Sequence, residues 1–253
     1  MLKEIIIAFR GFREALYYSR QHHLIKWMLI LGLLYVSLLF FFFVNFLPFY
    51  NGVTHVLFES LKLRERLQQG EDTAFQFLFI MGKVCFDIFL LLMCFSLYKF
   101  IFLLVTSPLF TYLNEKVLGA ENPEQHFPIN TLFRRVIHGM WMVVRVNLWM
   151  FVFMFFLIIF ALIPVLGWLA PMIMLALDVY YMGIVMFAFA QNTSDSASMQ
   201  RSFIAPQHRG LAVGNGIFFY VLHAIPFLGW ILAPGLALVA ATLNIRKLNK
   251  LKS

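Results

Sequence analysis

The chain has 253 residues, of which 62% are hydrophobic and 13% are charged, and its formal net charge is +8. Soluble domains carry about 25% charged residues, so this composition leaves too few charges to cover a water-soluble globule. We expect an integral membrane protein whose basic excess faces anionic lipid and the cytoplasm. Nucleic-acid binding is not expected, because no zinc-finger or RNP-like pattern accompanies the basic residues.

Residues 1–23 have the pattern of an amphipathic helix. Apolar residues recur at helical spacing, and basic residues fall elsewhere on the helical wheel. The apolar residues are Leu2, Ile5, Ile6, Phe9, Phe12 and Leu16. The basic residues are Lys3, Arg10, Arg13 and Arg20. A basic amphipathic helix at a chain terminus is typical of a segment that lies in the membrane interface.

Two long apolar segments follow, at residues 24–50 and 74–106. The first is long enough for one crossing and is predicted to end around Pro48. The second exceeds a hydrocarbon core of about 30 Å, so it should tilt or protrude into water. A break at "TSP", a short amphipathic helix and a loop are predicted after it, and residues 131–147 form another basic amphipathic stretch.

Two apolar pairs with the same interruption come next. Hairpin 1 is predicted at residues 148–190 around "IPVLGWLAP", and hairpin 2 at residues 211–244 around "IPFLGWILAP". Three of their four arms have only 14 to 16 residues, or about 21–24 Å, which is short of a full crossing. These lengths favour hairpins that enter the membrane partway, with four ordinary spans as the alternative. Proline and glycine would form the tips, at Pro164, Gly167, Pro226 and Gly229.

The sequence thus predicts an all-α integral membrane protein with a single membrane domain over residues 1–253. It would contain two long transmembrane helices, two partly inserted helical hairpins and amphipathic interfacial helices. Lys and Arg gather near both ends of the chain and in residues 107–147 and 193–210, whereas acidic residues outnumber basic ones in residues 51–73. The positive-inside rule therefore places both termini in the cytoplasm and residues 51–73 outside.

Five basic residues lie where the first helix meets the first span, and they could bind an anion: Arg13, Arg20, His22, His23 and Lys26. A tetrahedral dianion needs several donors that converge, and Arg, Lys and helix N-termini supply them. The same cations could instead anchor lipid headgroups. A metal site at His22 and His23 has little support, because no third ligand is near in sequence. We therefore expect no metal and no cofactor.

Charged residues that lie inside apolar segments include Lys83, Asp87 and Asp178. Lys83 and Asp87 are four residues apart, so they share a helix face and could form an ion pair or line a conduction path. A lone Lys or Asp at mid-membrane costs about 2.5–3.5 kcal/mol on insertion scales. Asp178 has no basic residue within a turn, so it should face a cavity, a neighbouring helix or an oligomer contact.

Four local motifs occur in a fixed order along residues 74–245: "SPLF" with "LNEKVLG", "IPVLGWLAP", "HRGLAVGNG", and "IPFLGWILAP" with "AATL". With them the chain resembles the CysZ-type sulfate permeases and the etoposide-induced membrane proteins grouped with them. The resemblance implies two long transmembrane helices with partly inserted hairpins, homo-oligomers, and sulfate uptake for cysteine synthesis across the bacterial inner membrane. Family members carry a Gly-Leu-Arg-Arg type segment, linked to sulfate binding, where this chain has Arg20, His22, His23 and Lys26.

Catalytic motifs give no support to an enzyme, since the sequence has no Gly-x-Ser-x-Gly elbow, His-Glu-x-x-His pair or Walker loop. We expect a permease or channel for a small inorganic anion, with sulfate as the first candidate and membrane lipid as a further partner. The alternative is a non-enzymatic membrane protein, such as a lipid-organising or assembly factor.

Overall fold

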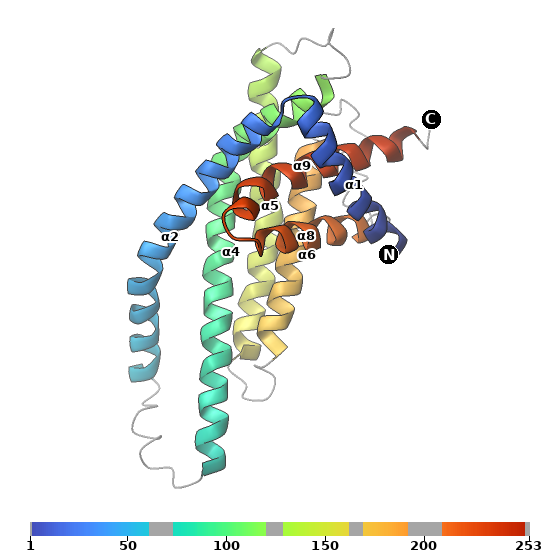
Figure 1. The fold of residues 1–253 in the computed structure, drawn as a ribbon. Coiled ribbons are helices and arrows are strands. Elements are labelled where there is room, and N and C mark those ends of the chain that lie inside the picture. Colours follow the sequence, from blue (N-terminus) through green and yellow to red (C-terminus); the bar gives the residue numbers. More distant parts are fainter. Residues whose placement is uncertain (1, 61–72, 120–128, 162–168, 192–208, 251–253) are drawn as a thin grey trace. The chain divides into compact units, whose positions relative to one another are not determined.

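The computed structural model describes residues 2–60, 73–119, 129–161, 169–191 and 209–250, and the regular structure in these ranges is helical (Figure 1). The helices are α1 (Leu2–Gln21), α2 (Ile25–Ser60), α4 (Thr73–Gly119), α5 (Ile129–Ala161), α6 (Ala170–Gln191), α8 (Arg209–His223) and α9 (Leu228–Lys250). The all-α class is confirmed, and five helices within the described ranges are long and apolar enough to cross a membrane.

Several helices continue through proline residues at which we predicted an end. Helix α2 continues past Pro48 to Ser60, and α4 continues through Pro108 to Gly119. The helix end predicted around Pro48 and the break predicted at "TSP" were therefore wrong, although the candidate membrane span of α2, Ile25–Gly52, agrees with the predicted first span. Proline removes one hydrogen bond from a helix, but in lipid an unwound segment would leave several backbone groups without any partner, so the continuous helix is favoured.

The arms of hairpin 1 are also longer than predicted. Helix α5 begins at Ile129, so the basic amphipathic stretch and the first arm form one helix of 33 residues, or about 50 Å. Helix α6 has 22 residues, which is enough for a crossing. The length argument for partial insertion was wrong for this hairpin, whose tip residues Pro164 and Gly167 lie outside the described residues. In hairpin 2 it still applies to α8, which has 15 residues, but it was wrong for α9, which has 23 residues and is long enough to cross.

The chain divides into two compact units, of which the first comprises residues 1–37, 100–149 and 178–253. In this unit α1 packs against α8 and α9, and α8 packs against α9 (Figure 1). Small residues form the buried stripe of α1, together with Phe12; its small members are Ala8, Gly11, Ala15 and Ser19. Gly11 faces the side chain of Asn244 on α9, where a Cβ would overlap.

Several bulky apolar residues of α1 are largely exposed, although the ring of Phe9 still lies 4.7 Å from that of Phe218 on α8. Ile6, Phe9 and Leu16 are each more than half exposed, although the helical wheel grouped them with the buried Phe12. Because exposed apolar side chains are stable in lipid but not in water, this outward face fits the predicted position in the membrane interface.

Glycine residues also allow α6 and α8 to approach closely. A Cβ on Gly183 would overlap the carbonyl oxygen of Ala212, and a Cβ on Gly216 would overlap the carbonyl oxygen of Val179. Small residues at such positions are the usual means by which helices associate in membranes, because they bring backbones into contact.

The second unit comprises residues 38–99 and 150–177. Its described contacts are mainly aromatic and apolar; the rings of Phe42 and Tyr98 lie 5.4 Å apart, and the Ser96 hydroxyl donates to the sulfur of Met150 at 3.5 Å. On α2, Phe40 and Phe41 are exposed, as expected for side chains that face lipid.

We predict that the close contact at Gly216 stabilises the fold. Replacement of Gly216 by Ala should lower the free energy of unfolding by about 1–3 kcal/mol, because the added methyl group meets the Val179 carbonyl. Gly82→Ala is the matched control, since nothing lies within 4 Å of a Cβ there. Thermal unfolding in detergent measures both, and equal melting temperatures for the two variants would contradict the prediction.

Candidate functional site

The turn between α1 and α2 has a strained backbone. The amide of His22 donates to the Tyr18 carbonyl and the amide of Leu24 donates to the Ser19 carbonyl, each at 3.0 Å. Between them, His23 has a φ of 54°, in the left-handed region that non-glycine residues rarely adopt. Such strain costs about 1–3 kcal/mol and is concentrated at functional sites, so this turn is a candidate site in its own right.

Basic residues from four helices surround this turn. We call the group the basic corner and define it by four predicted residues and two that the sequence analysis missed: Arg20, His22, His23, Lys26, Lys116 and Arg246. Arg20, His23, Lys26 and Lys116 are exposed, and His22 is half-buried. Lys116 comes from α4 and Arg246 from α9, so no local sequence signal connects them with the turn.

Tyr18 joins three sides of the basic corner. Its hydroxyl donates to the carbonyl of Val117 at 2.8 Å, its ring lies 4.3 Å from that of His22, and the guanidinium of Arg246 contacts its hydroxyl. Burial raises the pKa of Tyr18, and the neighbouring Arg246 opposes the rise. The hydroxyl therefore stays protonated at neutral pH and remains the donor in its bond to α4.

An aromatic contact brings the first turn of α2 beside the last turns of α4. The rings of Trp27 and Tyr112 lie 4.6 Å apart, and the Lys116 ammonium lies 5.6 Å from the centre of the Tyr112 ring. The N-terminal end of α2 thus lies within the basic corner. A helix N-terminus offers free amide groups and a partial positive charge, so this arrangement suits an anion.

Arg13 lies outside the basic corner. It is exposed on α1 two turns before Arg20, or about 10 Å away along the helix axis. The structure therefore brings together four of the five predicted basic residues and separates the fifth. Within the described residues, no three His, Cys, Asp or Glu side chains lie close enough to hold a metal ion.

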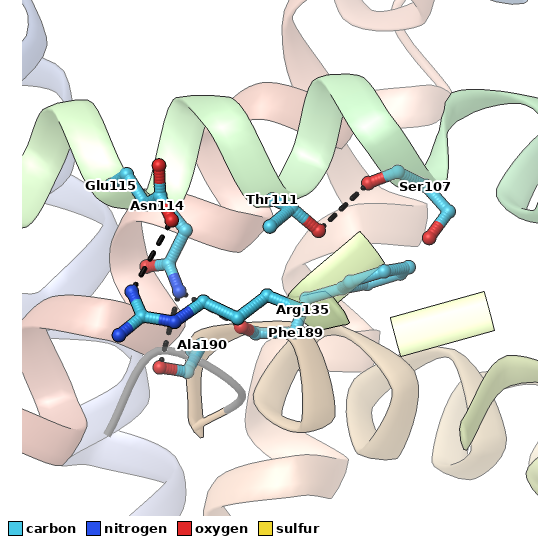
Figure 2. A network of polar contacts seen from close by, with 7 residues as sticks. All are labelled: Ser107, Thr111, Asn114, Glu115, Arg135, Phe189 and Ala190. Carbon is cyan, nitrogen blue, oxygen red and sulfur yellow. Dashed lines mark hydrogen bonds and ion pairs between the residues drawn. The ribbon is translucent and has the colours of Figure 1, made fainter. Parts of the chain in front are cut away.

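A buried polar network lies next to the basic corner on α4 (Figure 2). The Asn114 amide donates to the carbonyls of Phe189 and Ala190 at 2.8 and 3.2 Å, and the hydroxyl of Thr242 donates to the Asn114 oxygen at 2.7 Å. These carbonyls belong to the last turn of α6, which has no amides of its own to satisfy them. Asn114 therefore caps α6 and binds α9 at the same time.

Glu115 forms a largely buried ion pair with Arg135 of α5, with 3.2 Å between the charged atoms (Figure 2). The two side chains are 9% and 12% exposed. Because Arg135 neutralises the carboxylate, Glu115 does not cancel the positive charge of the basic corner.

Asp178 faces a neighbouring helix, which was one of the three predicted environments. The hydroxyl of Tyr220 on α8 donates to its carboxylate, and the side chain of Asp178 is 2% exposed. One turn further along α8, the ring of His223 lies 3.4 Å from the hydroxyl of Tyr35, measured from Nε2. Titratable side chains from α2, α6 and α8 therefore meet in this unit.

The chain reverses at the tip of hairpin 2 through a different residue from the predicted Gly229. Phe227 adopts the left-handed conformation with a φ of 60°, whereas Gly229 does not. Gly229 is needed instead because a Cβ would overlap the Leu222 carbonyl. Trp230 packs beside the turn as expected, and its indole donates to the His223 carbonyl at 3.0 Å.

The backbone of this tip satisfies its own hydrogen bonds. The amides of Ala224, Ile225, Leu228 and Gly229 all donate to carbonyls within residues 220–226. We had expected the tip around Pro226 to need a hydrated cavity or a neighbouring helix, and the turn makes that unnecessary. Phe227 and Leu228 are 71% and 67% exposed, so the described chain does not bury the tip.

Charged residues in the second unit are placed as follows. Lys83 is exposed, and the half-buried carboxylate of Asp87 accepts a hydrogen bond from Tyr50 of α2. An ion pair between Lys83 and Asp87 stays a prediction. The sequence analysis missed Lys99, which is only 3% exposed and lies 4.9 Å from the ring centre of Phe95.

The chain matches a known protein family. The sequence profile of the family described as sulfate transporter CysZ/etoposide-induced protein 2.4 matches residues 7–234. That range contains the whole basic corner except Arg246, and it contains Asn114 and Asp178. No curated protein sequence matches the chain.

We predict that Asn114 and Thr242 stabilise the protein as a coupled pair. Asn114→Ala should cost about 1–3 kcal/mol, because it removes the donor to two buried carbonyls and the acceptor of the Thr242 hydroxyl, which then keeps its bond to the Leu238 carbonyl. After that change, Thr242→Val should cost less than it does in the wild type. Thr111→Val is the control, since the Thr111 hydroxyl donates only within its own helix, to Ser107. Additive losses in denaturant or thermal unfolding would show that the pair is not coupled.

Proposed function

Because the chain belongs to the sulfate transporter CysZ/etoposide-induced protein 2.4 family, we propose that it is a membrane permease or channel for a small inorganic anion. Sulfate is the expected substrate, and sulfur assimilation is the expected use. The protein is non-enzymatic in this proposal, and it acts as a homo-oligomer in the bacterial inner membrane.

The basic corner is the observation that carries this proposal. Sulfate presents four oxygens that accept hydrogen bonds, and it carries two negative charges. Arg20 offers a planar guanidinium, Lys26 offers an ammonium, and the N-terminus of α2 offers backbone amides. His23, which has a strained backbone, lies between Arg20 and Lys26 in the sequence. This site captures the anion on the cytoplasmic side of the membrane.

A second candidate function rests on the outward face of α1. There the exposed Arg13 and Arg20 follow the exposed Phe9 and Leu16 by four residues, so these cations lie beside the apolar side chains and not elsewhere on the wheel as first described. Basic and apolar side chains together are the composition of a helix that binds anionic lipid. In a lipid-organising or assembly factor, the basic corner would hold headgroup phosphates instead of sulfate. The two functions differ in whether free sulfate competes for the corner.

The first test of this proposal is sulfate flux. Purified full-length protein in proteoliposomes should take up radiolabelled sulfate, and the double variant Arg20→Gln/Lys26→Gln should lower uptake at least about tenfold, as expected when charge-assisted bonds are lost. Lys247→Gln is the matched control, because it removes an exposed cation that pairs with the exposed Glu14. Wild-type protein that is folded and passes no sulfate, but whose thermal stability depends on phosphatidylglycerol and on Arg20, would favour the lipid function.

The second test concerns orientation. In a background without Cys85 and Cys94, single cysteines at Gln69 and Ser198 should react with membrane-impermeant reagents from opposite sides, with Ser198 inside. Labelling from one side only would contradict the positive-inside assignment. Equal labelling of each site from both sides would show dual orientation.

A further inference from the structure

The contact between α1 and α9 encloses a side-chain amide whose polar atoms have no partner. Asn244 of α9 is 1% exposed, and neither its oxygen nor its nitrogen forms a hydrogen bond in the described part of the chain. Its side chain occupies the space that a Cβ on Gly11 of α1 would need. A buried amide without partners destabilises the arrangement that buries it, because water would satisfy the same atoms. Movement of α1 away from α9 would therefore relieve this cost.

The contacts that hold α1 in its docked position are weak. Apart from Phe12, the fully buried residues of α1 are small, so they bury little apolar area. Glu14 pairs with Lys247 of α9, but both side chains are about half exposed, so water screens the pair and it contributes little. Near the end of α1, the Tyr18 hydroxyl donates to a carbonyl of α4 at 2.8 Å. The docked position thus depends on few interactions, and the enclosed amide opposes them.

The turn that joins α1 to α2 has the properties of a hinge. His23 has a φ of 54° in this turn, and strained residues of this kind cluster at switch regions. Hinges are residues at the ends of elements that absorb a change in φ and ψ. The exposed Ile6 and Leu16 lie in the lipid interface whether or not α1 contacts α9. Helix α1 can therefore move at His23 without bringing these apolar side chains into water.

We propose that α1 is a gate at the basic corner, which docks when an anion is bound and moves away on the hinge at His23 to release it. The gate rests on the proposed function, because it regulates the same site. Arg20 lies in the last turn of α1, and Lys116 lies near the end of α4. Without an anion these two cations repel each other, and this repulsion acts together with the enclosed Asn244 to favour undocking. A bound anion attracts both cations, so anion binding and docking are coupled.

Distances between spin labels test whether α1 moves. The labels are attached through Tyr17→Cys on α1 and Val221→Cys on α8, at side chains that are 72% and 56% exposed. The full-length chain without Cys85 and Cys94 is placed in lipid nanodiscs. Double electron–electron resonance should give two distances without sulfate, one for docked and one for undocked α1. Sulfate should raise the ratio of docked to undocked protein at least about fivefold.

Two substitutions should shift this ratio in opposite directions. Asn244→Leu removes the enclosed polar atoms, so it should give mainly docked protein without sulfate. Tyr18→Phe removes a hydrogen bond that exists only in the docked position, so it should raise the undocked population. Asn147→Leu is the matched control and should leave the ratio unchanged, because Asn147 is also buried but donates within its own helix, α5. If leucine at position 244 prevents folding beside Gly11, Asn244→Ala removes the same polar atoms without adding volume.

A cleavable cross-link tests whether the movement serves transport. Glu14→Cys and Lys247→Cys are joined by a disulfide-containing reagent in proteoliposomes, which holds α1 on α9. Sulfate uptake should fall at least about tenfold, as expected when the step that releases the anion is blocked, and reduction of the reagent should restore it. Either single variant treated with the same reagent is the control and should keep its uptake.

The outcomes separate this inference from the proposed function. A single distance that does not change with sulfate would overturn the gate, and so would full sulfate uptake by the cross-linked protein; sulfate uptake by the wild type would leave the proposed function standing in both cases. Wild type that passes no sulfate, although sulfate shifts the distances, would overturn the proposed function and support the coupling between anion binding and docking.

Discussion

The organisation of the first unit depends on the hydrogen bonds made by the side-chain amide of Asn114. A helix that ends inside protein or lipid leaves carbonyls that water cannot satisfy, and α6 ends in this way at Phe189 and Ala190. Asn114 supplies the missing donor from α4 and accepts from Thr242 of α9 with its other atom. One side chain therefore fixes the ends of three helices in register. The neighbouring Glu115 extends the same anchor to α5 through Arg135.

This anchor explains how the basic corner can be assembled from distant parts of the sequence. Once α4 is fixed to α9, Lys116 and Arg246 lie near the same turn, and Tyr18 binds the end of α4 through Val117. The small residues on α1 allow that helix to lie close to α8 and α9, so Arg20 and the two histidines are held at its end. Positive charges repel one another, and the hydrogen bonds of the uncharged Asn114, Tyr18 and Thr242 oppose that repulsion.

The sequence predicted the class and the main parts of this protein, and each group of errors has its own physical cause. Hydrophobicity and charge identified a helical membrane protein, and four of the six corner residues were found because they are neighbours in sequence. Helix ends were misplaced at Pro48 and Pro108, because proline rules come from water, where an unwound backbone can bind solvent. Lys116, Arg246 and Asn114 could not be assigned, since their partners lie on other helices. Lys99 could have been found, because a single charge among 26 uncharged neighbours in residues 88–114 is visible in the sequence alone.

The turn at the tip of hairpin 2 has a consequence for how the protein enters the membrane. Its amides are satisfied by residues within a few positions, and its outer surface is apolar at Ile225, Phe227 and Leu228. Contacts so close in sequence form on the microsecond timescale, far faster than the synthesis of the chain. Helices α8 and α9 can therefore pair early, with four amides of the turn at their leading end already hydrogen-bonded. Helices α8 and α9 then enter the membrane before they dock on α1.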